Sequence, residues 1–294
     1  MPHPKIERMV DEDLARHLLR AQHPDLADLP LTWVGTGWDN AMWRLGEHLV
    51  LRFPVRDASA LLVEHEQVWL PVLAPTLPVE VPVPVRNGAP GEGYPWPWSV
   101  VPWFEATTAA TTPPASHGAW AEQLADFFVA LHVPAPDDAP DNPVRGDDIA
   151  VRREPLRDRL AQLALPDSER IAARFDELAS APRWTGAPVW VHGDPHPANL
   201  LEHDGVLRAV IDFGDVTSGD PACDLATAWM TFDAPARARF RARIDAACGW
   251  DDAMWRRAQA WALHLSVVMQ THPVEYPHLA AVGRHGIEQA LDAV

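Results

Sequence analysis

Two short segments of the chain combine, at defined spacings, residue types that could do chemistry. The first, residues 192–199, reads His-Gly-Asp-Pro-His-Pro-Ala-Asn, and the second, thirteen positions beyond Asn199, reads Asp212-Phe213-Gly214. A carboxylate such as Asp194 can orient an attacking hydroxyl and accept its proton, while Asn199 and Asp212 offer the hard oxygen ligands that magnesium prefers. These are the groups that phosphoryl transfer from a nucleoside triphosphate needs. We therefore interpret Asp194 as the catalytic residue and Asn199 and Asp212 as metal ligands.

Each of these residues also has an ordinary structural interpretation. Asp194 alone would be an Asx turn that closes a strand, Asn199 a turn residue and Asp212 a strand end. Any one of these residues would be weak evidence for a chemical role, but their joint order and spacing favour the chemical interpretation. His192 and His196 could be bases or metal ligands, but imidazole is not a usual ligand of magnesium, so we expect both to brace the loop through hydrogen bonds.

A glycine-containing turn in the first third of the chain could contact phosphate groups. Gly35-Thr36-Gly37 is followed by Asp39 and Asn40, and such a turn can donate backbone N–H groups to an anion. The pattern lacks the third glycine of the usual phosphate-covering loop, and an ordinary hairpin turn explains it as well. We therefore assign Gly35, Thr36, Gly37 and Asn40 to nucleotide binding as an expectation.

The basic group expected beside the phosphates is an arginine. Lys5 is the only lysine in the chain, so a cation in a nucleotide site must be arginine or histidine. Arg52 lies in a strand-like run, and Glu66 lies on the following predicted helix, where it could pair with Arg52. Arginine grips phosphate through two donors, which makes it chemically acceptable in this role. Glu64 is the competing partner, and a surface arginine with an exposed helical acid is the alternative.

Three further aspartates follow the second segment. Asp224 opens an apolar helix, and we expect it to be buried and to accept hydrogen bonds from backbone N–H groups of residues 192–199. Asp220 is expected to cap the same helix, with Pro221 at its first position. Asp215 could support the site as a neighbouring acid.

The elements that must position these residues differ between the two parts of the chain. Periodicity and turn residues predict mostly strands in the first part and mostly helices in the second. In the first part we expect helices at 11–22 and 59–70 and strands within 31–45 and at 48–54, 79–85 and 98–101. In the second we expect helices at 119–131, 168–179, 222–231, 234–248, 252–271 and 277–294, with short apolar runs at 189–191 and 207–211. A loop rich in proline and aspartate covers 134–148. This texture predicts an α+β, two-lobed plan with a β-rich lobe at 1–103 and a mainly helical lobe at 104–294.

Composition restricts the partners. The net charge of −17 disfavours nucleic acid and anionic membranes, and it would attract a cationic small molecule, although acidity can also serve only solubility. No apolar run of eighteen or more residues predicts a membrane span, and the N-terminus lacks the apolar stretch of a secretory signal. Only two cysteines are present, which is typical of a reducing compartment. These features predict a cytoplasmic protein.

The chain resembles the aminoglycoside phosphotransferase family, within the protein-kinase-like fold, over essentially its whole length. His192-Gly193-Asp194 with Asn199, followed by Ile211-Asp212-Phe213-Gly214-Asp215, is similar to the signature of that family, in which glycine replaces the arginine of the protein kinases. Segments 51–54, 66–71 and 94–100 look like an actinobacterial-type branch in which arginine takes the lysine position.

The resemblance implies magnesium, ATP or GTP as co-substrate, and transfer to a hydroxyl of a small molecule, with an aminoglycoside-type antibiotic as the leading acceptor. It also implies that residues 1–103 bind the nucleotide, with Val101 and Trp103 near the base in the hinge, and that residues 104–294 bind the acceptor. Acids such as Glu105, Asp233 and Glu275 could meet ammonium groups. A macrolide or a small metabolite is the alternative acceptor, and a nucleotide-binding pseudoenzyme is the alternative of another class.

Overall fold

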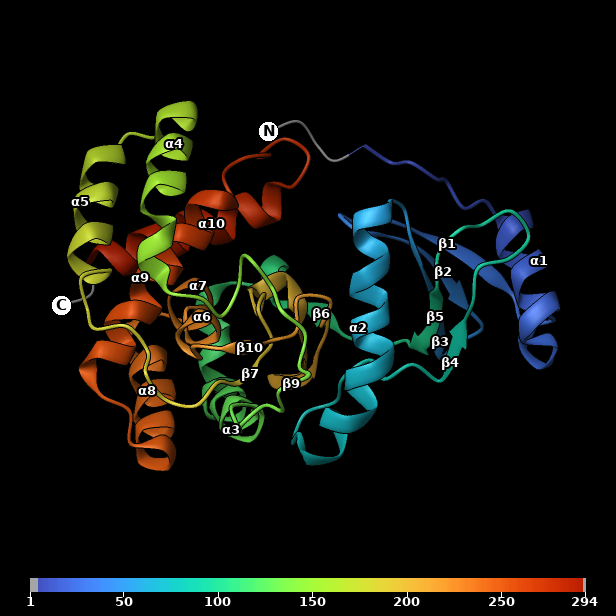
Figure 1. The fold of residues 1–294 in the computed structure, drawn as a ribbon, viewed down its shortest axis with the longest axis horizontal. Helices are drawn as coiled ribbons and strands as arrows, with labels where there is room; N and C mark the ends of the chain where they lie inside the picture. Colours follow the sequence, from blue (N-terminus) through green and yellow to red (C-terminus); the bar gives the residue numbers. More distant parts are fainter. Residues whose placement is uncertain (1–4, 293–294) are drawn as a thin grey trace. The chain divides into compact units, whose positions relative to one another are not determined.

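The computed structural model describes residues 5–292 and has an α+β architecture (Figure 1). The chain divides into two compact units, which we describe separately. The first unit runs up to Pro75 and includes Glu80–Glu105 and Asp212–Gly214, and the second comprises Thr76–Val79, Ala106–Ile211 and the chain from Asp215 onward. The change from strands to helices predicted from the sequence is therefore confirmed. No helix within residues 5–292 combines the length and apolarity that crossing a membrane requires.

The first unit is built on a five-stranded antiparallel sheet. Its strands follow the order β1 (Leu31–Thr36), β2 (Asn40–Leu45), β3 (Leu49–Pro54), β5 (Trp98–Pro102) and β4 (Arg86–Gly88). In this register Arg52 of β3 lies opposite Met42 of β2 and Ser99 of β5. A bulge between Trp33 and Gly35 interrupts the pairing of β1 with β2, which is a common device for re-aiming a strand near its end. The central strand β3 thus holds Arg52 firmly between two neighbours.

Two helices and an aromatic core complete the first unit. Helix α1 (Glu12–Gln22) begins at Asp11, whose side chain accepts the N–H of Leu14, and it buries one apolar face in the core. Phe53 stacks on Trp98 at 5.0 Å between ring centroids, and the Tyr94 hydroxyl donates to the carbonyl of Pro54 at 2.7 Å. Helix α2 (Asp57–Leu73) contacts β3 and β5. The helix therefore presents Glu66 toward the strand that carries Arg52.

Residues 79–85, expected to form a strand, do not form one. The fourth strand of the sheet is Arg86–Gly88, and Val85 only donates its N–H to the carbonyl of Val100 at 2.8 Å. Pro82 and Pro84 lack the N–H groups that a sheet ladder needs, which explains why the apolar run does not itself form a strand. Valine content alone misled the sequence prediction here.

The second unit is mainly helical. Its central helix is α9 (Asp252–Val268), which is buried on nearly all sides and packs against α4, α5, α6, α7 and α10 (Figure 1). These surrounding helices are α4 (Arg153–Leu163), α5 (Ser168–Leu178), α6 (Ala222–Leu225), α7 (Thr227–Thr231) and α10 (Pro277–Asp292), and α3 (Ala121–Leu131) packs on α8 (Ala234–Cys248). Most of the residues of α9 are buried, including the polar Arg257, Gln259 and His264, as expected of a helix in the middle of such a bundle.

Short strands in the second unit frame the segment at 192–199. Strand β7 (Val189–Val191) pairs with β10 (Thr217–Gly219), and β8 (Leu200–His203) lies between β6 (Thr107–Thr108) and β9 (Val206–Val210). The β8–β9 hairpin turns at Asp204 and Gly205, both with positive φ. An Asp-Gly pair is a strong hairpin signal. Strand β8 could therefore have been predicted from the sequence, although it was not.

Several helix boundaries differ from expectation. The predicted helix at 222–231 is two helices, α6 and α7, and the one expected at 252–271 ends at Val268. Helix α4 was not predicted, because its sequence is dominated by charged residues with only Leu156 and Leu160 buried. Residues 293–294 of the last predicted helix lie outside the described residues.

Candidate active site

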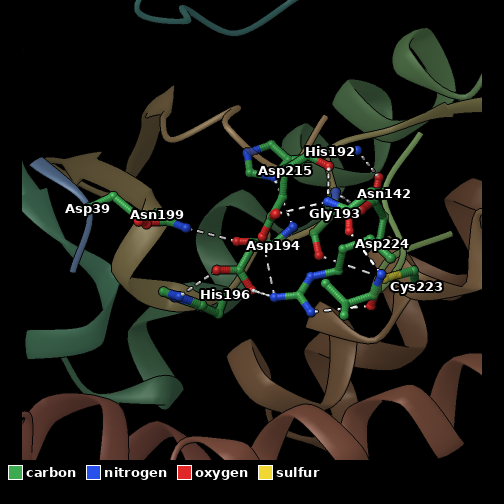
Figure 2. Close-up of polar contacts among 12 residues, drawn as sticks. Asp39, Asn142, His192, Gly193, Asp194, His196, Asn199, Asp215, Cys223 and Asp224 are labelled. Carbon is green, nitrogen blue, oxygen red and sulfur yellow. Dashed lines mark hydrogen bonds and ion pairs between the residues drawn. The ribbon is translucent and has the colours of Figure 1, made fainter. Parts of the chain in front are cut away.

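The loop at 192–199 follows strand β7 and is anchored by one buried carboxylate. Asp224 accepts the backbone N–H of His192 at 2.8 Å and that of Gly193 at 2.9 Å (Figure 2), and it pairs with His132 at 3.0 Å. Both side chains of the Asp224–His132 pair are fully buried. The structural role predicted for Asp224 is confirmed. Its neighbour Asp220 accepts the N–H of Ala222 at 3.1 Å, but Pro221, which was expected at the first helical position, is itself the N-cap of α6. Asp220 also forms a buried ion pair with Arg257 that the sequence did not indicate.

Gly193 occupies a backbone position that other residues adopt only with strain. Its φ is +91°, and a β-carbon at this position would lie 2.6 Å from the carbonyl oxygen of Asp215 and 3.2 Å from Cγ of Arg145. Glycine is therefore required by conformation and by the close approach of the segment after Asp212-Phe213-Gly214. This explains physically why the loop has glycine where protein kinases have arginine.

Gly193→Ala is expected to destabilise the protein by about 1–3 kcal/mol and to lower activity as well, because the new methyl group must push Asp215 away from the loop. Urea unfolding and steady-state transfer kinetics measure the two effects. Gly249→Ala is a suitable control: it has a similar positive φ of +65° but open space around its Cα. If both variants lose the same stability and both keep full activity, the contact with Asp215 is irrelevant to the loop.

Two cationic or polar groups hold the Asp194 carboxylate. Arg145 Nη2 lies 3.2 Å from Oδ1, and His196 Nε2 lies 3.3 Å from Oδ2. Because Nδ1 of His196 accepts the N–H of Ala198, its proton is on Nε2, facing Asp194. Burial alone would raise the pKa of Asp194, but His196 and Arg145 together hold it well below its ordinary value. Asp194 is therefore charged at physiological pH and oriented through both oxygens.

Arg145 is the functional residue that the sequence prediction missed. It lies in the loop at 134–148, which is tied to residues 215–220 by hydrogen bonds that include Asn142 Nδ2 to Asp215 Oδ1, Thr217 Oγ1 to the carbonyl of Pro140, and the N–H of Asp220 to the carbonyl of Gly146. The same guanidinium also lies 3.4 Å from Asp215 Oδ2. Burial opposes its charge, yet Asp194 and Asp215 raise the pKa of Arg145 above its ordinary value. The neighbouring acid expected at Asp215 thus acts by holding Arg145.

The remaining polar residues of the loop brace it internally. Asn199 Nδ2 donates to the carbonyl of Asp194 at 2.8 Å, which orients its amide oxygen away from that bond. His192 Nδ1 accepts the N–H of Asp194, and its Nε2 donates to the carbonyl of Ile211 at 3.1 Å. Burial lowers the pKa of His192, so the ring is neutral. The bracing roles expected for His192 and His196 are confirmed.

The first unit holds the predicted Arg52–Glu66 pair. Arg52 Nη1 donates to both carboxylate oxygens of Glu66, at 2.8 and 2.7 Å, and Nη2 lies 3.4 Å from Asp212 Oδ1. Glu64, the competing partner, is exposed. Burial opposes the charge of Arg52, but Glu66 and Asp212 raise its pKa above the ordinary value. The pairing with Glu66 is confirmed, and arginine fills the lysine position without leaving the buried acid unpaired.

The segment Asp212-Phe213-Gly214 has unusual backbone geometry. Asp212 adopts a φ of +66°, which is uncommon for a residue other than glycine, and the N–H of Phe213 donates to Glu66 Oε1 at 3.0 Å. Such strained positions concentrate at functional sites. Gly214 does not have a positive φ. It is needed because a β-carbon there would lie 2.9 Å from Cβ of Leu62.

The predicted glycine turn is a hairpin turn with its donors partly used. Gly35 has open space around it, and the N–H of Gly37 donates to the carbonyl of Asn40 at 2.9 Å. Asp39 is held by Arg56 and by the Ser59 hydroxyl, the latter at 2.6 Å. The phosphate contacts of Gly35, Thr36, Gly37 and Asn40 stay a prediction.

Val101 and Trp103 lie at the end of β5, as the hinge prediction requires. Val101 is buried and faces Val50 in the register, while the N–H of Trp103 donates to the carbonyl of His48 at 2.7 Å. The Trp103 ring carries the guanidinium of Arg44 at 4.9 Å. Their contact with a nucleobase stays a prediction.

The acids expected to meet ammonium groups have other partners. Glu105 pairs with Arg44, and Asp233 accepts the N–H of Ala236 at 3.0 Å as the cap of α8. Glu275 lies 3.9 Å from His272. Capping and pairing explain these acids without a ligand.

Known proteins with the same architecture identify the fold. The model of the phosphotransferase enzyme family matches residues 31–261. Aminoglycoside 2′-phosphotransferase-IIIa, solved in complex with GDP, is 19% identical, with a TM-score of 0.67 over 96% of this chain and 99% of that one. A macrolide 2′-phosphotransferase of type I is 22% identical, with a TM-score of 0.64 over 94% and 98%. Macrolide 2′-phosphotransferase MphH from Brachybacterium faecium is 21% identical, with a TM-score of 0.62 over 97% and 99%.

Curated protein sequences contain no match to the chain. The family model nevertheless covers well over half of its length, including the loop with Asp194 and Asn199 and the segment from Asp212 to Gly214. The chain therefore belongs to the phosphotransferase enzyme family and is a small-molecule kinase.

Proposed function

We propose that the protein transfers the γ-phosphate of ATP or GTP to a hydroxyl group of a small molecule. The observation that supports this most is the state of Asp194, a charged carboxylate held through both oxygens by Arg145 and His196. A carboxylate so fixed can align a hydroxyl and accept its proton without reorganising. The GDP bound to aminoglycoside 2′-phosphotransferase-IIIa supports a purine nucleotide as the co-substrate.

Arg52 is the proposed phosphate ligand. Its guanidinium is oriented by Glu66, and only about a tenth of the side chain is exposed. A preorganised arginine can hold two phosphate oxygens with charge-assisted hydrogen bonds. Gly35, Thr36, Gly37 and Asn40, together with Val101 and Trp103, complete the proposed nucleotide contacts.

Asn199 and Asp212 are the proposed magnesium ligands, and their donor atoms fit that ion. The Asp212 carboxylate is about half exposed, and the Asn199 amide uses its nitrogen in the loop, which leaves an oxygen as the ligand atom. Hard oxygens of this kind, few in number, suit an ion that keeps water and phosphate in its shell. When bound, magnesium would neutralise charge on the phosphates.

The acceptor predicted from the sequence is an aminoglycoside-type antibiotic. Similar structures include both an aminoglycoside and a macrolide phosphotransferase, which supports either class. The capping role of Asp233 and the pairing of Glu105 weaken the specific argument for ammonium groups. We therefore propose a hydroxyl as the reacting group of the acceptor.

Arg52→Gln is expected to raise the KM for the nucleotide by about 10- to 100-fold, because it removes charge-assisted contacts worth about 1.5–3 kcal/mol. Arg52→Lys, which keeps the charge, should retain most of the affinity. Steady-state kinetics at saturating acceptor measure both. Arg16→Gln, which only breaks a surface pair with Glu12, is the matched control. Equal KM values for wild type and Arg52→Gln would remove Arg52 from the nucleotide site.

Release of nucleoside diphosphate, measured with ATP or GTP and magnesium, tests the function itself. The acceptor panel should contain aminoglycosides, macrolides, simple alcohols and hydroxy acids. Acceptor-dependent release that stops when EDTA removes magnesium supports the proposal. Nucleotide binding with no hydrolysis or transfer under any condition would instead support the pseudoenzyme.

A further inference from the structure

Three arginines and a histidine gather beside the Asp194 loop in the second unit. We call Arg145, Arg152, Arg159 and His264 the arginine cluster. Arg152 and Arg159 come from the helical segment at 149–163, which packs against α9, the helix that carries His264. Arg152 lies 5.9 Å from the ring centroid of Trp261 and donates to the carbonyl of Pro143 at 2.6 Å, two residues before Arg145.

The contacts made by this cluster leave much of its hydrogen-bonding capacity unused. Nε of each of the three arginines and Nδ1 of His264 are buried and have no hydrogen-bond partner among the described residues. Within residues 5–292 the Arg159 guanidinium donates only to the Thr271 hydroxyl, at 2.9 Å. Buried donors are normally satisfied, since each unmade bond costs about 1–3 kcal/mol. All three guanidinium groups lie close enough to His264 to influence its charge, so these four atoms are available together to a ligand.

The positive charge of Arg152 and Arg159 indicates that the ligand of the arginine cluster is an anion. The protein has a net charge of −17, yet within residues 5–292 neither Arg152 nor Arg159 forms an ion pair with a carboxylate. Arg157, on the exposed side of the same helix α4, pairs with Glu154 and Asp176. Acidic partners are thus abundant on this helix, and the inward arginines are the ones that lack them.

His264 is suited to contact an anion as a neutral donor. Its side chain lies in the core and is only 9% exposed. Burial, followed by the charges of the three arginines, lowers the pKa of His264 to about 3. The ring is therefore uncharged at physiological pH and can offer one N–H to an acceptor oxygen.

We propose that the arginine cluster binds an oxyanion, a carboxylate or a phosphate, carried by the acceptor. The proposal rests on the proposed function, because it is Arg145 that joins the cluster to the catalytic carboxylate: it lies 3.2 Å from Asp194 Oδ1. The acceptor class is then a hydroxylated acid or a sugar phosphate, with its anionic group on the arginines and its hydroxyl at Asp194.

The reaction of such an acceptor is an ordinary phosphoryl transfer. The hydroxyl oxygen bonds to the γ-phosphorus, and its proton passes to Asp194. The bond from the γ-phosphorus to the oxygen that bridges it to the β-phosphate breaks. The nucleoside diphosphate leaves with the electron pair, and the products are the phosphorylated acid and the diphosphate.

Anion binding is tested first without any acceptor. Sulfate is titrated into the protein saturated with magnesium and nucleoside diphosphate, so that the nucleotide site is filled, and calorimetry measures its affinity. The double variant Arg152→Gln/Arg159→Gln is expected to bind sulfate at least about tenfold more weakly, the loss of one charge-assisted contact or more. Arg152→Lys/Arg159→Lys should retain most of the affinity, and Arg157→Gln should bind like wild type. Equal affinity in wild type and the Gln double variant would overturn the proposal.

Matched acceptors then identify the source of the anion. Glycerate is compared with glycerol, and gluconate with glucose, at constant ionic strength. We expect the acid of each pair to have a kcat/KM at least about tenfold higher, and the Gln double variant to lose this preference. Sulfate that competes with the acid places the anion on the acceptor, whereas sulfate binding without competition would overturn that source in favour of a free anion. Absence of all turnover despite sulfate binding counts against the proposed function alone, while turnover without sulfate binding counts against the arginine cluster alone.

Discussion

Asp194→Ala is expected to lower kcat for phosphoryl transfer by about 10²- to 10⁴-fold, the usual contribution of a positioned general base, while the nucleotide affinity stays within about twofold. In the proposed mechanism the carboxylate acts on the acceptor hydroxyl and other residues bind the nucleotide, so the loss should appear in kcat. Removal of Asp194 also leaves Arg145 with Asp215 as its remaining acidic partner. Diphosphate release at saturating acceptor and nucleotide measures the rate, and calorimetry measures the nucleotide affinity.

Asp194→Asn and Asp13→Ala complete this test. Asn keeps the shape of the side chain but cannot take up a proton, so it should be nearly as inactive as Ala. Asp13 is exposed in the first turn of α1, and its loss should leave kcat unchanged. Turnover of Asp194→Ala at the wild-type rate would refute the catalytic assignment, and an equal loss of nucleotide affinity would indicate collapse of the loop instead.

Asp224→Ala is expected to reduce the free energy of unfolding by about 3–5 kcal/mol, because it removes one partner from a buried and hydrogen-bonded group. Three donors lose their acceptor at once: the N–H groups of His192 and Gly193 and the ring of His132. The catalytic loop loses its anchor in the same change, so kcat should fall as well. Urea unfolding followed by circular dichroism measures the stability.

Two further variants separate the loss of the bonds that hold the loop from a general effect of removing an acidic residue. Asp224→Asn keeps one acceptor oxygen and should cost less than Ala. Asp252→Ala breaks an exposed pair with Arg241, and such pairs contribute about 0–1 kcal/mol. If Asp224→Ala costs no more than Asp252→Ala, the carboxylate does not hold the loop.

Sequence spacing was sufficient to predict contacts between neighbouring elements of the chain and contacts of residue types with a clear chemical role. The pairing of Arg52 with Glu66 follows from a strand and the next helix, and the role of Asp224 follows from an acid at the start of an apolar helix. Burial then decided between Glu64 and Glu66, because only Glu66 lies on the inward face of α2.

Contacts between loops that lie far apart in the chain could not be predicted from the sequence. Arg145 reaches Asp194 only because its loop is bonded to residues 215–220, some seventy positions away, and no local period encodes that distance. Helix α4 was missed because few of its residues are apolar, and the strand at Arg86–Gly88 depends on pairing with β5 rather than on its own composition. Long-range contacts rather than local propensity determine the loop with Arg145 and the strand at Arg86–Gly88.

Glu66 holds two parts of the first unit with one carboxylate, since it accepts both the Arg52 guanidinium and the N–H of Phe213. A phosphate that draws Arg52 toward itself would change the bond that fixes the backbone beside Asp212. A cation at Asp212 would in turn change the charge that Arg52 meets. Such linkage is reciprocal. If bound nucleotide raises the affinity for the metal by some factor, bound metal raises the affinity for the nucleotide by the same factor. Nucleotide and metal would then bind cooperatively through a single side chain, with no movement of a helix or strand required.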